Sequence, residues 1–371
     1  AKPYLCYIQE CDKKGKIKNN GGKRKMKKKG MIAVLAVLMI LSSTSSAAVH
    51  AEDLSAEEVQ KVSDQICKSS SDKVYNHLIY SVSYDGTITI QGIDNANENA
   101  NIELVIPAEI NGCKVTTIAS SAFSGCVNIK SVTLNDGLVT IGNWAFDGTS
   151  ISVVDIPATV TTIGEYAFSS CLNLTKVTFQ EGLKTIGNYA FTKCSLLTGN
   201  IVIPSTATEI GIDAFSGTAI TGLKIEEGAL GIKLDGRAFT DCANLSELEL
   251  NRVTVMDYMC FKNDMAITNV TLPQGLQIIG TQAFLGANNL GGNLIVPSTV
   301  TSIGDEAFKG TSIEGLTVEE GNEGITIGYD TFRECVNLKY ANLSNRLKQI
   351  GYDAFWGDSK LVWVRIADGN Y

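Results

Sequence analysis

The sequence predicts a repeat solenoid, a stack of short coils with a parallel β-sheet along one face. Phenylalanine recurs every 22 to 24 residues, and a pair of apolar residues spaced by two recurs with it. A period of ~20 to 29 residues is typical of solenoids, in which each coil buries its apolar face only against its neighbours. We therefore expect one domain of about eleven coils, marked by Phe123, Phe146, Phe168, Phe191, Phe215, Phe239, Phe261, Phe284, Phe308, Phe332 and Phe355.

Basic residues are concentrated at the start of the chain. Residues 1–51 carry 11 basic and 2 acidic side chains, which leaves 20 basic and 37 acidic side chains in the rest, a formal charge of −17. An acidic surface repels phosphate backbones and anionic lipid heads. We expect no nucleic-acid partner.

Residues 26–51 have the pattern of a secretory signal peptide. A lysine-rich segment precedes the apolar run Met31–Leu41, and a small, polar stretch ends at Ala51, where we predict cleavage. The apolar run has 11 residues, too few to cross a bilayer as a helix. An uncleaved N-terminal anchor is the alternative. We expect export with no membrane insertion after cleavage, and an over-extended or disordered start at residues 1–25, because Met26 is the better initiator.

Residues 52–101 are predicted to form an N-terminal cap. Apolar residues at helical spacing from Glu52 to about Lys73 favour an amphipathic helix. Tyr80 to Ile90 alternates apolar and polar residues around Asp85-Gly86, a dipeptide favoured in hairpin turns with two positive φ angles. A terminal repeat needs a distinct, wettable face. We predict that the helix and the hairpin cover the open end of the solenoid.

Each coil begins with a short strand. Val177 and Phe179 point to one side and Lys176 and Thr178 to the other, because side chains alternate along a strand. Stacked coils place such strands ~4.8 Å apart in a parallel sheet. Equivalent inward pairs are Val132/Leu134, Val154/Ile156, Leu223/Ile225, Leu248/Leu250, Val270/Leu272, Leu316/Val318 and Val364/Ile366.

The remainder of each coil returns the chain. Proline follows several strands and ends the ladder, since it has no N–H. A second apolar pair such as Leu183/Ile186 follows. The next recurring residue is glycine, from which we expect a backbone conformation closed to other residues: Gly142, Gly164, Gly187, Gly211, Gly280, Gly304, Gly328 and Gly351. The phenylalanine ring is expected to insert between coils.

This pattern resembles the BspA-like, treponemal-type leucine-rich-repeat family, whose unit reads L-x-x-I-x-I-P-x-x-V-x-x-I-G-x-x-A-F-x-x-C. The match covers residues 102–371. Asp235 and Asp257 replace the glycine, Cys260 and Thr331 replace the alanine, and Gly199-Asn200 and Gly292-Asn293 lengthen two strand entries. The resemblance implies a right-handed leucine-rich-repeat coil in a secreted or bacterial cell-surface protein, often an adhesin, with no enzymatic activity in the repeats.

Five cysteines occupy one repeat position, three residues after the phenylalanine, where other coils have threonine. A position filled by Cys or Thr suits a small buried side chain, so we predict free, buried thiols. A disulfide between Cys171 and Cys194 in successive coils is the alternative. The five are Cys126, Cys171, Cys194, Cys242 and Cys335; Cys67, Cys113 and Cys260 lie elsewhere.

The sequence offers no set of residues for catalysis or for a cofactor. No Cys-x-x-Cys occurs, and His77 is the one histidine beyond residue 51, without a spaced Ser and Asp. Acid pairs such as Glu226/Glu227 are read as solvated turn charges, because calcium needs a denser set of oxygens. We expect neither an enzyme nor a bound metal or cofactor.

The outward strand positions are the predicted binding surface. They form two rows across the sheet, and Tyr340, Trp363 and Arg365 fall on adjacent coils. Tyr, Trp and Arg are enriched at binding hot spots. The alternative is that these aromatic residues pack against a further coil or cap, since the solenoid is expected to be truncated after Tyr371. The candidate ligand-binding residues are Tyr340, Trp363, Arg365, Lys176, Lys224, Glu247 and Glu249.

Two functions compete at this stage. The first is an exported binding protein that recognises an extracellular protein or glycan through the strand face. The second is a non-catalytic spacer or targeting arm of a larger exported protein or enzyme.

Overall fold

A computed structural model describes residues 73–94 and 101–367, which divide into two units. The smaller unit comprises residues 73–94 and 108–116, and the larger unit comprises residues 101–107 and 117–367. The predicted signal peptide, the predicted helix at Glu52 to Lys73 and Cys67 lie outside the described residues. The role of the smaller unit as a cap stays a prediction.

The smaller unit consists of antiparallel hairpins. Strand β2 (Leu78–Val82) pairs with β1 (Lys73–Tyr75) and β3 (Ile88–Ile93), and β5 (Glu109–Ile110) pairs with β6 (Cys113–Ile118). The predicted hairpin at Tyr80 to Ile90 is present. Its turn differs from the expectation, because it is a wider loop in which Gly86 has a positive φ and Asp85 does not. Two-residue turns with both φ angles positive occur at Asn76-His77 and Asn111-Gly112, and Asn-Gly is a favoured pair for such turns.

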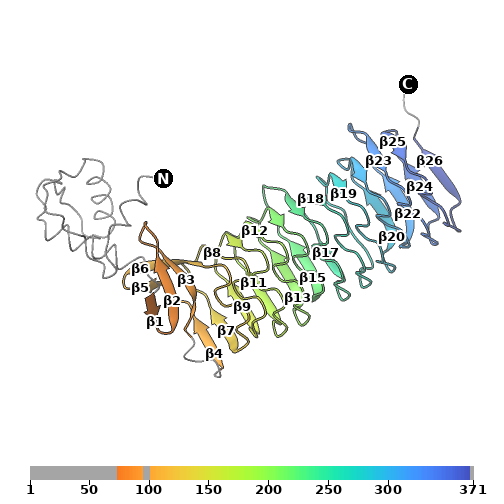
Figure 1. Ribbon diagram of the computed structural model, residues 1–371. Coiled ribbons are helices and arrows are strands. Elements are labelled where there is room, and N and C mark those ends of the chain that lie inside the picture. Colours follow the sequence, from red (N-terminus) through yellow and green to blue (C-terminus); the bar gives the residue numbers. More distant parts are fainter. Residues whose placement is uncertain (1–72, 95–100, 368–371) are drawn as a thin grey trace, which may run out of the picture. The chain divides into compact units, whose positions relative to one another are not determined.

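The larger unit is the predicted solenoid, and its coils carry parallel strands on two sides (Figure 1). We call the first set the face strands. They are β4 (Ile102–Val105), β7 (Ile129–Thr133), β9 (Val153–Ile156), β11 (Lys176–Phe179), β13 (Thr198–Ile203), β15 (Ala219–Ile225), β17 (Glu247–Glu249), β20 (Gly291–Val296), β22 (Ser312–Val318), β24 (Tyr340–Leu343) and β26 (Trp363–Ile366).

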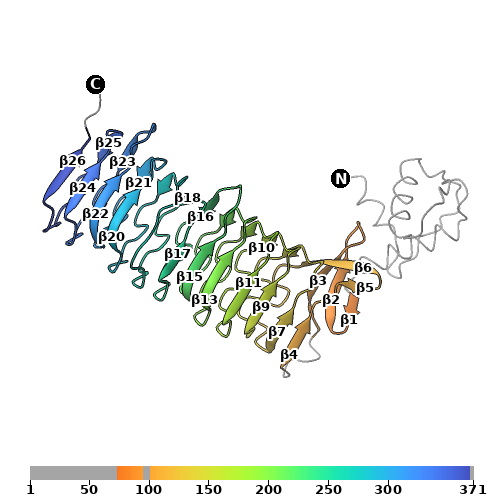
Figure 2. The ribbon, with the colours of Figure 1, turned by 180° about the vertical axis from the view of Figure 1, so that it is seen from behind.

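The second set, the return strands, was not predicted. It is built from a short segment in the returning part of each coil, Thr-Ile in several of them, and its strands pair in parallel through the stack (Figure 2). Its members are the end of β6, then β8 (Thr140–Ile141), β10 (Thr162–Ile163), β12 (Thr185–Ile186), β14 (Glu209–Ile210), β16 (Ile232–Leu234), β18 (Val253–Met256), β19 (Ile278–Ile279), β21 (Ser302–Ile303), β23 (Ile325–Ile327) and β25 (Leu347–Ile350).

The eleven phenylalanines form one stack of rings through the larger unit. Successive ring centroids lie 5.1 to 5.6 Å apart, and ten of the eleven rings, from Phe123 to Phe332, are fully buried. Burial of an aromatic ring is the largest apolar contribution that one residue can make to such a coil. The predicted role of these residues is confirmed.

The recurring glycines are required for a reason other than the predicted one. None of the eight has a positive φ. Instead, a Cβ on Gly187 would lie 2.7 Å from the carbonyl carbon of Gly164 in the preceding coil, and Gly142 and Gly351 show the same close approach to backbone. The glycine therefore allows two turns to stack at backbone contact distance, since any Cβ would clash with main-chain atoms.

Positive φ angles occur at two other positions of every coil. The residue two before each phenylalanine has a φ between 52° and 59°, and none of these eleven residues is glycine. The residue two after the phenylalanine also has a positive φ; it is glycine in six coils and Ser170, Lys193, Asp241, Asn263 or Glu334 in the others. The tight Ala-Phe turn therefore depends on residues in the left-handed backbone conformation. Most of these residues are not glycine, and adopting this conformation costs them conformational free energy.

The cysteine position is buried as predicted in most coils. Cys171, Cys194, Cys242 and Cys335 are buried free thiols, and each donates a hydrogen bond of 3.1 to 3.2 Å to the carbonyl of a phenylalanine in the preceding coil. Cys126 is only half-buried. Two coils place an aspartate here, Asp264 and Asp358, and both carboxylates are buried. These two residues depart from the rule of a small, uncharged side chain.

The sequence also contains a longer repeat, which comprises several of the 23-residue units. Residues 199–261 match residues 292–355 at an offset of 93 or 94, and they include the two lengthened strand entries, where a bulge shifts the register. Each copy has one buried arginine, Arg252 or Arg346. The guanidinium of Arg252 donates hydrogen bonds to the carbonyls of Pro204, Ala207, Glu226 and Leu230, and Arg346 makes the equivalent four. Each arginine thus ties three coils together.

Candidate ligand-binding surface

The two predicted outward rows are confirmed by the register of the face strands. Glu247 lies beside Gly222, which lies beside Asn200; Trp363 lies beside Tyr340, which lies beside Gly315. The rows are interrupted between β17 and β20. Residues 268–273 form no strand, although Val270 and Leu272 were expected to lie in one. We call the outward surface of the face strands the strand face.

The seven candidate residues do not converge on one site. Lys176 lies on β11, a second group lies on β15 and β17, and a third lies on β24 and β26. In the second group, Nζ of Lys224 lies 3.6 Å from Oε2 of Glu249, and both side chains are about half exposed. Exposed ion pairs contribute little to the stability of the fold, because water screens the attraction between their charges. Lys176 and Glu247 are exposed as well.

The residues of the third group are positioned by contacts with one another and with neighbouring strands. The hydroxyl of Tyr340 on β24 donates a hydrogen bond of 3.1 Å to Oδ1 of Asn293, which belongs to β20 two strands away. Between them lies Gly315 on β22, where a Cβ would be only 2.3 Å from Cζ of Tyr340. The phenol therefore lies down over the glycine, with its long axis along the stack of strands.

Trp363 continues this arrangement on β26. Its ring centroid lies 5.4 Å from that of Tyr340, with 21° between the planes. The two rings are therefore stacked on each other. Trp363 keeps 47% of its surface exposed. We call Tyr340 and Trp363 the aromatic platform.

Polar side chains flank the platform. Two residues further along the same strands, Asn342 lies beside Arg365. Among the described residues, no carboxylate forms a salt bridge with Arg365. Val364 and Ile366 were predicted to point inward, yet they are 44% and 57% exposed, because no described coil covers them.

A second surface, which the sequence did not predict, runs along the turns before each phenylalanine. Trp144, Tyr166 and Tyr189 stack there with centroids 5.5 and 4.5 Å apart and planes within 7°. These rings are stacked on one another, as the rings of Tyr340 and Trp363 are. The signal was present in the sequence, because all three stand two residues before a repeat phenylalanine.

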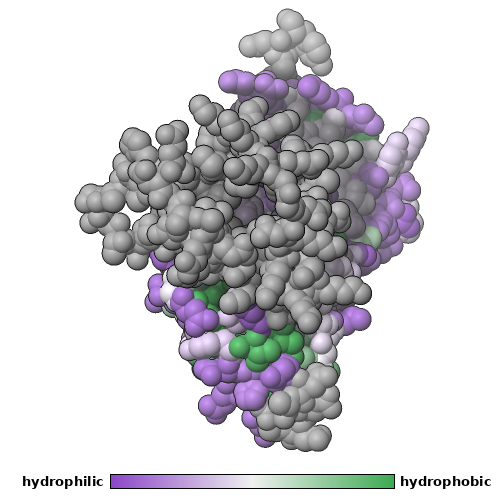
Figure 3. Space-filling view, turned by 60° about the vertical axis from the view of Figure 1, so that its left-hand side comes forward, coloured by the Kyte–Doolittle hydropathy of each residue, from purple (hydrophilic) through white to green (hydrophobic). Residues whose placement is uncertain are grey.

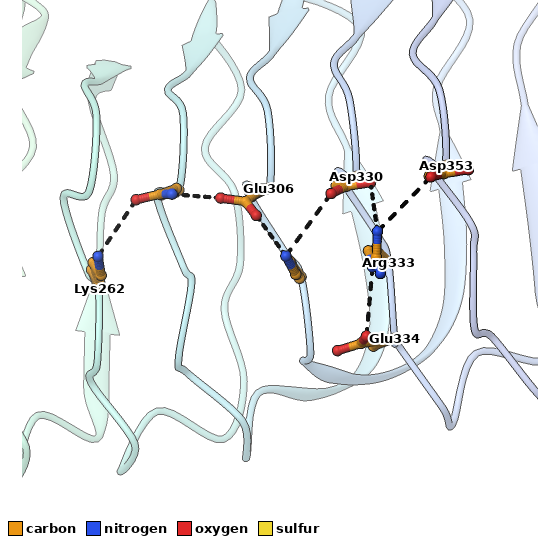
Figure 4. A network of polar contacts seen from close by, with 8 residues as sticks. Lys262, Glu306, Asp330, Arg333, Glu334 and Asp353 are labelled. Atoms are coloured by element: carbon orange, nitrogen blue, oxygen red, sulfur yellow. Dashed lines mark hydrogen bonds and ion pairs between the residues drawn. The ribbon is translucent and has the colours of Figure 1, made fainter.

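The same line of turns becomes an ionic network further along the stack (Figure 4). Lys309 lies 2.6 Å from Glu306 and 3.9 Å from Asp330, and Arg333 lies 3.5 Å from both Asp330 and Glu334. Arg333 also covers the ring of Trp356 at 4.2 Å. Lys309 and Arg333 each have an acidic partner in their own coil and another in the next coil, so these charges are paired within the chain.

The described residues hold no group of three or more His, Cys, Asp and Glu side chains that could bind a metal ion. Burial raises the pKa of the Cys242, Cys260 and Cys335 thiols, which makes them poor nucleophiles. His77 lies 2.9 Å from Asp94 in the smaller unit. No helix within the described part of the chain is long and apolar enough to span a bilayer. In the view of Figure 3, the described surface is largely hydrophilic, with small hydrophobic patches.

The chain matches the model of one protein family. The model of the BspA type leucine rich repeat region matches in six copies over residues 98–221, 208–325 and 254–370. No curated protein matches the chain.

Several solved structures are similar in fold. A leucine rich cell surface protein from Faecalibacterium prausnitzii A2-165 has 21% identity over 81% of this chain and 96% of its own, with a TM-score of 0.41. The pneumococcal vaccine antigen PcpA has 16% identity over 80% and 94%, with a TM-score of 0.42. The leucine rich repeat protein of T. pallidum has 24% identity over 72% and 91%, with a TM-score of 0.33. At these values the three structures say nothing of what the chain binds.

Proposed function

The chain belongs to the BspA-type leucine-rich-repeat family, and from that premise we propose that it is a non-catalytic binding module of the bacterial surface or the secreted fraction. The strand face carries recognition, in the manner of an adhesin, and the ligand is an extracellular protein or a glycan. A solenoid presents an extended surface rather than an enclosed cavity, which suits the binding of a large partner.

The observation that carries this proposal is the difference between the two long repeats. Their buried positions are alike: both copies keep the cysteine of the phenylalanine turn and the arginine that joins three coils. On the strand face they differ, because Tyr340 stands where the first copy has Glu247, and Asn342 where it has Glu249. Close packing restricts which residues can replace one another at buried positions. Outward positions have no such restriction, so their residues can differ according to the ligand.

The turn surface is the weaker candidate. Its aromatic residues stack on one another and its charges are paired within the chain, so little of its chemistry is left for a partner. On the strand face, Arg365 forms no salt bridge with any residue that the structure describes.

Photo-crosslinking tests which face binds. A benzophenone amino acid is placed at Lys176, Glu247 or Arg365 on the strand face, and at the exposed Lys184 or Gln277 beside the return strands as matched controls. The labelled proteins are exposed to extracellular-matrix and bacterial-surface fractions. We expect one recurrent partner from the strand-face probes only. Equal yields from both sets, or a partner from the return strands alone, would overturn the proposal; no partner from either set would favour the spacer or targeting-arm function.

A further inference from the structure

The cysteine position, three residues after each phenylalanine, supplies a hydrogen-bond donor in six coils. Each of these six side chains donates to the backbone carbonyl of a phenylalanine over 2.8 to 3.2 Å. The threonine hydroxyls bond within their own coil, and the cysteine thiols bond to the preceding coil. The position therefore joins a neutral donor to a main-chain acceptor inside the solenoid. The six residues are Thr218, Thr311, Cys171, Cys194, Cys242 and Cys335.

Asp264 and Asp358 occupy this position in two other coils, and as carboxylates they could accept hydrogen bonds but not donate them. Oδ1 of Asp264 accepts the backbone N–H of Cys242 at 2.8 Å, but its Oδ2 is buried without a partner. Both carboxyl oxygens of Asp358 are also buried without a partner. A buried anion that lacks partners is unfavourable, whereas a protonated carboxyl is neutral and has a donor.

We propose that Asp264 and Asp358 keep their protons in the folded solenoid and donate them to the carbonyls of Phe239 and Phe332, and that ionisation opens the stack at these two coils. Each acceptor is the phenylalanine of the preceding coil, as it is for the four thiols. At Asp264 one neutral carboxyl group then bridges the N–H of Cys242 and the carbonyl of Phe239, which an anion cannot do. This inference concerns the stack itself and does not depend on what the strand face binds.

The arrangement occurs twice, in register with the two copies of the long repeat. In both copies the threonine hydroxyl also lies 3.3 or 3.4 Å from the thiol of the next coil. The second aspartate lies in the turn before β26, so opening there loosens the strand that carries Trp363. Threonine, cysteine and aspartate follow one another in three successive coils, as Thr218, Cys242 and Asp264 and again as Thr311, Cys335 and Asp358.

The groups around the two carboxyls favour the neutral acid. Asp264 is faced by the carboxylate of Asp241 and by the thiols of Cys242 and Cys260, and Asp358 is faced by the thiol of Cys335. Within the described ranges, neither carboxyl forms a salt bridge with a basic side chain. Burial raises the pKa of Asp358 to about 7, and it raises the pKa of Asp264 well above its usual range.

A raised pKa sets the direction of the pH dependence. In an opened coil the carboxyl returns to its ordinary pKa of about 4, so opening becomes about tenfold easier with each pH unit between that value and the folded pKa. The stability that the protonated carboxyl supplies is thus complete below about pH 4 and is lost as the pH rises to the folded pKa. For Asp358 the loss should end near pH 7. For Asp264, which is more deeply buried, it should continue at higher pH.

Hydrogen exchange of the full chain, followed by mass spectrometry, tests this inference because it measures the opening of each segment separately. The rates are first corrected for the intrinsic effect of pH on amide exchange. We expect opening around Asp358 to rise on the order of 100-fold from pH 5 to pH 7 and then to level off, and opening around Asp264 to keep rising to pH 8. Opening around Cys194, which holds the same position in another coil, should not change from pH 5 to pH 7.

Two substitutions make the test specific to each site. Asp358→Asn should remove the pH dependence of opening around residue 358 and leave that around residue 264, and Asp264→Asn should do the reverse, since an amide is neutral and keeps a donor. Asp136→Asn, at an exposed carboxylate, is the control and should change neither.

Three results would overturn the proposal: opening that is independent of pH around both aspartates, an equal pH dependence in every coil, or a dependence that survives substitution of the local aspartate. The unsubstituted chain alone decides the first two, so the proposal stays testable even if a variant fails to fold.

Discussion

The hydroxyl of Tyr340 bonds to Asn293 at 3.1 Å, two face strands away, across a glycine that leaves room for the ring. The first long repeat has the same Asn and Gly, and there the carboxamide of Asn200 fills the space above Gly222. In both copies a side chain therefore lies over a glycine of the neighbouring strand. Only in the second copy is that side chain an aromatic ring. The glycines of the strand face and those of the turns should respond differently to substitution.

Gly187→Ala should cost much more stability than Gly315→Ala. The new Cβ at 187 would meet backbone atoms of the preceding coil, which cannot move away, and we expect a loss of about 2 kcal/mol or more. At 315 the new Cβ meets the end of the Tyr340 side chain, which can swing off, so the loss should stay under about 1 kcal/mol. Urea unfolding of both variants measures this, and equal losses would contradict the backbone-contact explanation.

Lys193→Gly should stabilise the protein. Lys193 has a φ of 60° at a turn position where six other coils have glycine. A residue with a Cβ pays about 1 kcal/mol to adopt this conformation, so glycine should recover part of that. The reverse change, Gly217→Lys at a φ of 70°, should lose a similar amount. Thermal unfolding of the pair checks the prediction, and shifts in the same direction would refute it.

Asp264→Asn should raise stability at alkaline pH. Burial raises the pKa of the Asp264 carboxyl well above its usual range, and its Oδ2 has no hydrogen-bond partner. A raised pKa in the folded state means that this group contributes stability below its unfolded pKa of about 4, and that the contribution is lost as pH rises toward the folded pKa. The variant should therefore remove a decline in stability with pH.

The gain from Asp264→Asn at pH 8 should be about 2 kcal/mol or more, with little gain near pH 4. The amide keeps the acceptor for the backbone N–H of Cys242, which donates to Oδ1 at 2.8 Å. Unfolding midpoints from pH 4 to pH 8 provide the measurement. Asp136→Asn, a change at an exposed carboxylate several coils away, is the control for a nonspecific effect of replacing Asp with Asn.

Arg252→Met and Arg346→Met should each destabilise the solenoid strongly. Each guanidinium satisfies four backbone carbonyls, and two of those bonds reach a coil about 45 residues or more away in sequence. Removal leaves carbonyls unpaired, which we expect to cost about 3 kcal/mol. Arg365→Met on the strand face should cost less than about 0.5 kcal/mol. A small loss at both buried sites would show that water replaces the arginine without penalty.

Much of the scaffold could be predicted from the sequence, because the repeat exposes it many times. The phenylalanine stack, the inward pairs of the face strands and the outward rows all follow from residue spacing. The return strands were not predicted, because segments of two to four residues are too short to show alternation. The role of glycine was misread, since spacing does not separate a special φ from a close approach of two backbones.

The candidate site was predicted only in part. Spacing alone placed Tyr340 beside Trp363, and the register of β24 and β26 confirms it. It did not indicate that Tyr340 lies over Gly315, because that contact depends on side-chain direction across strands. Residue spacing also did not indicate the hydrogen bonds of Arg252. Their acceptors are backbone carbonyl groups, which every residue type has.

The central claim, that the strand face is the binding surface, is tested most directly by equilibrium binding of the crosslinked partner to two triple variants. One combines Tyr340→Ala, Trp363→Ala and Arg365→Ala; the other combines Lys184→Ala, Gln277→Ala and Ile278→Ala, which lie on or directly before return strands. We predict at least a tenfold loss of affinity in the first variant and none in the second. Wild-type affinity in the first, or a loss confined to the second, would contradict the claim.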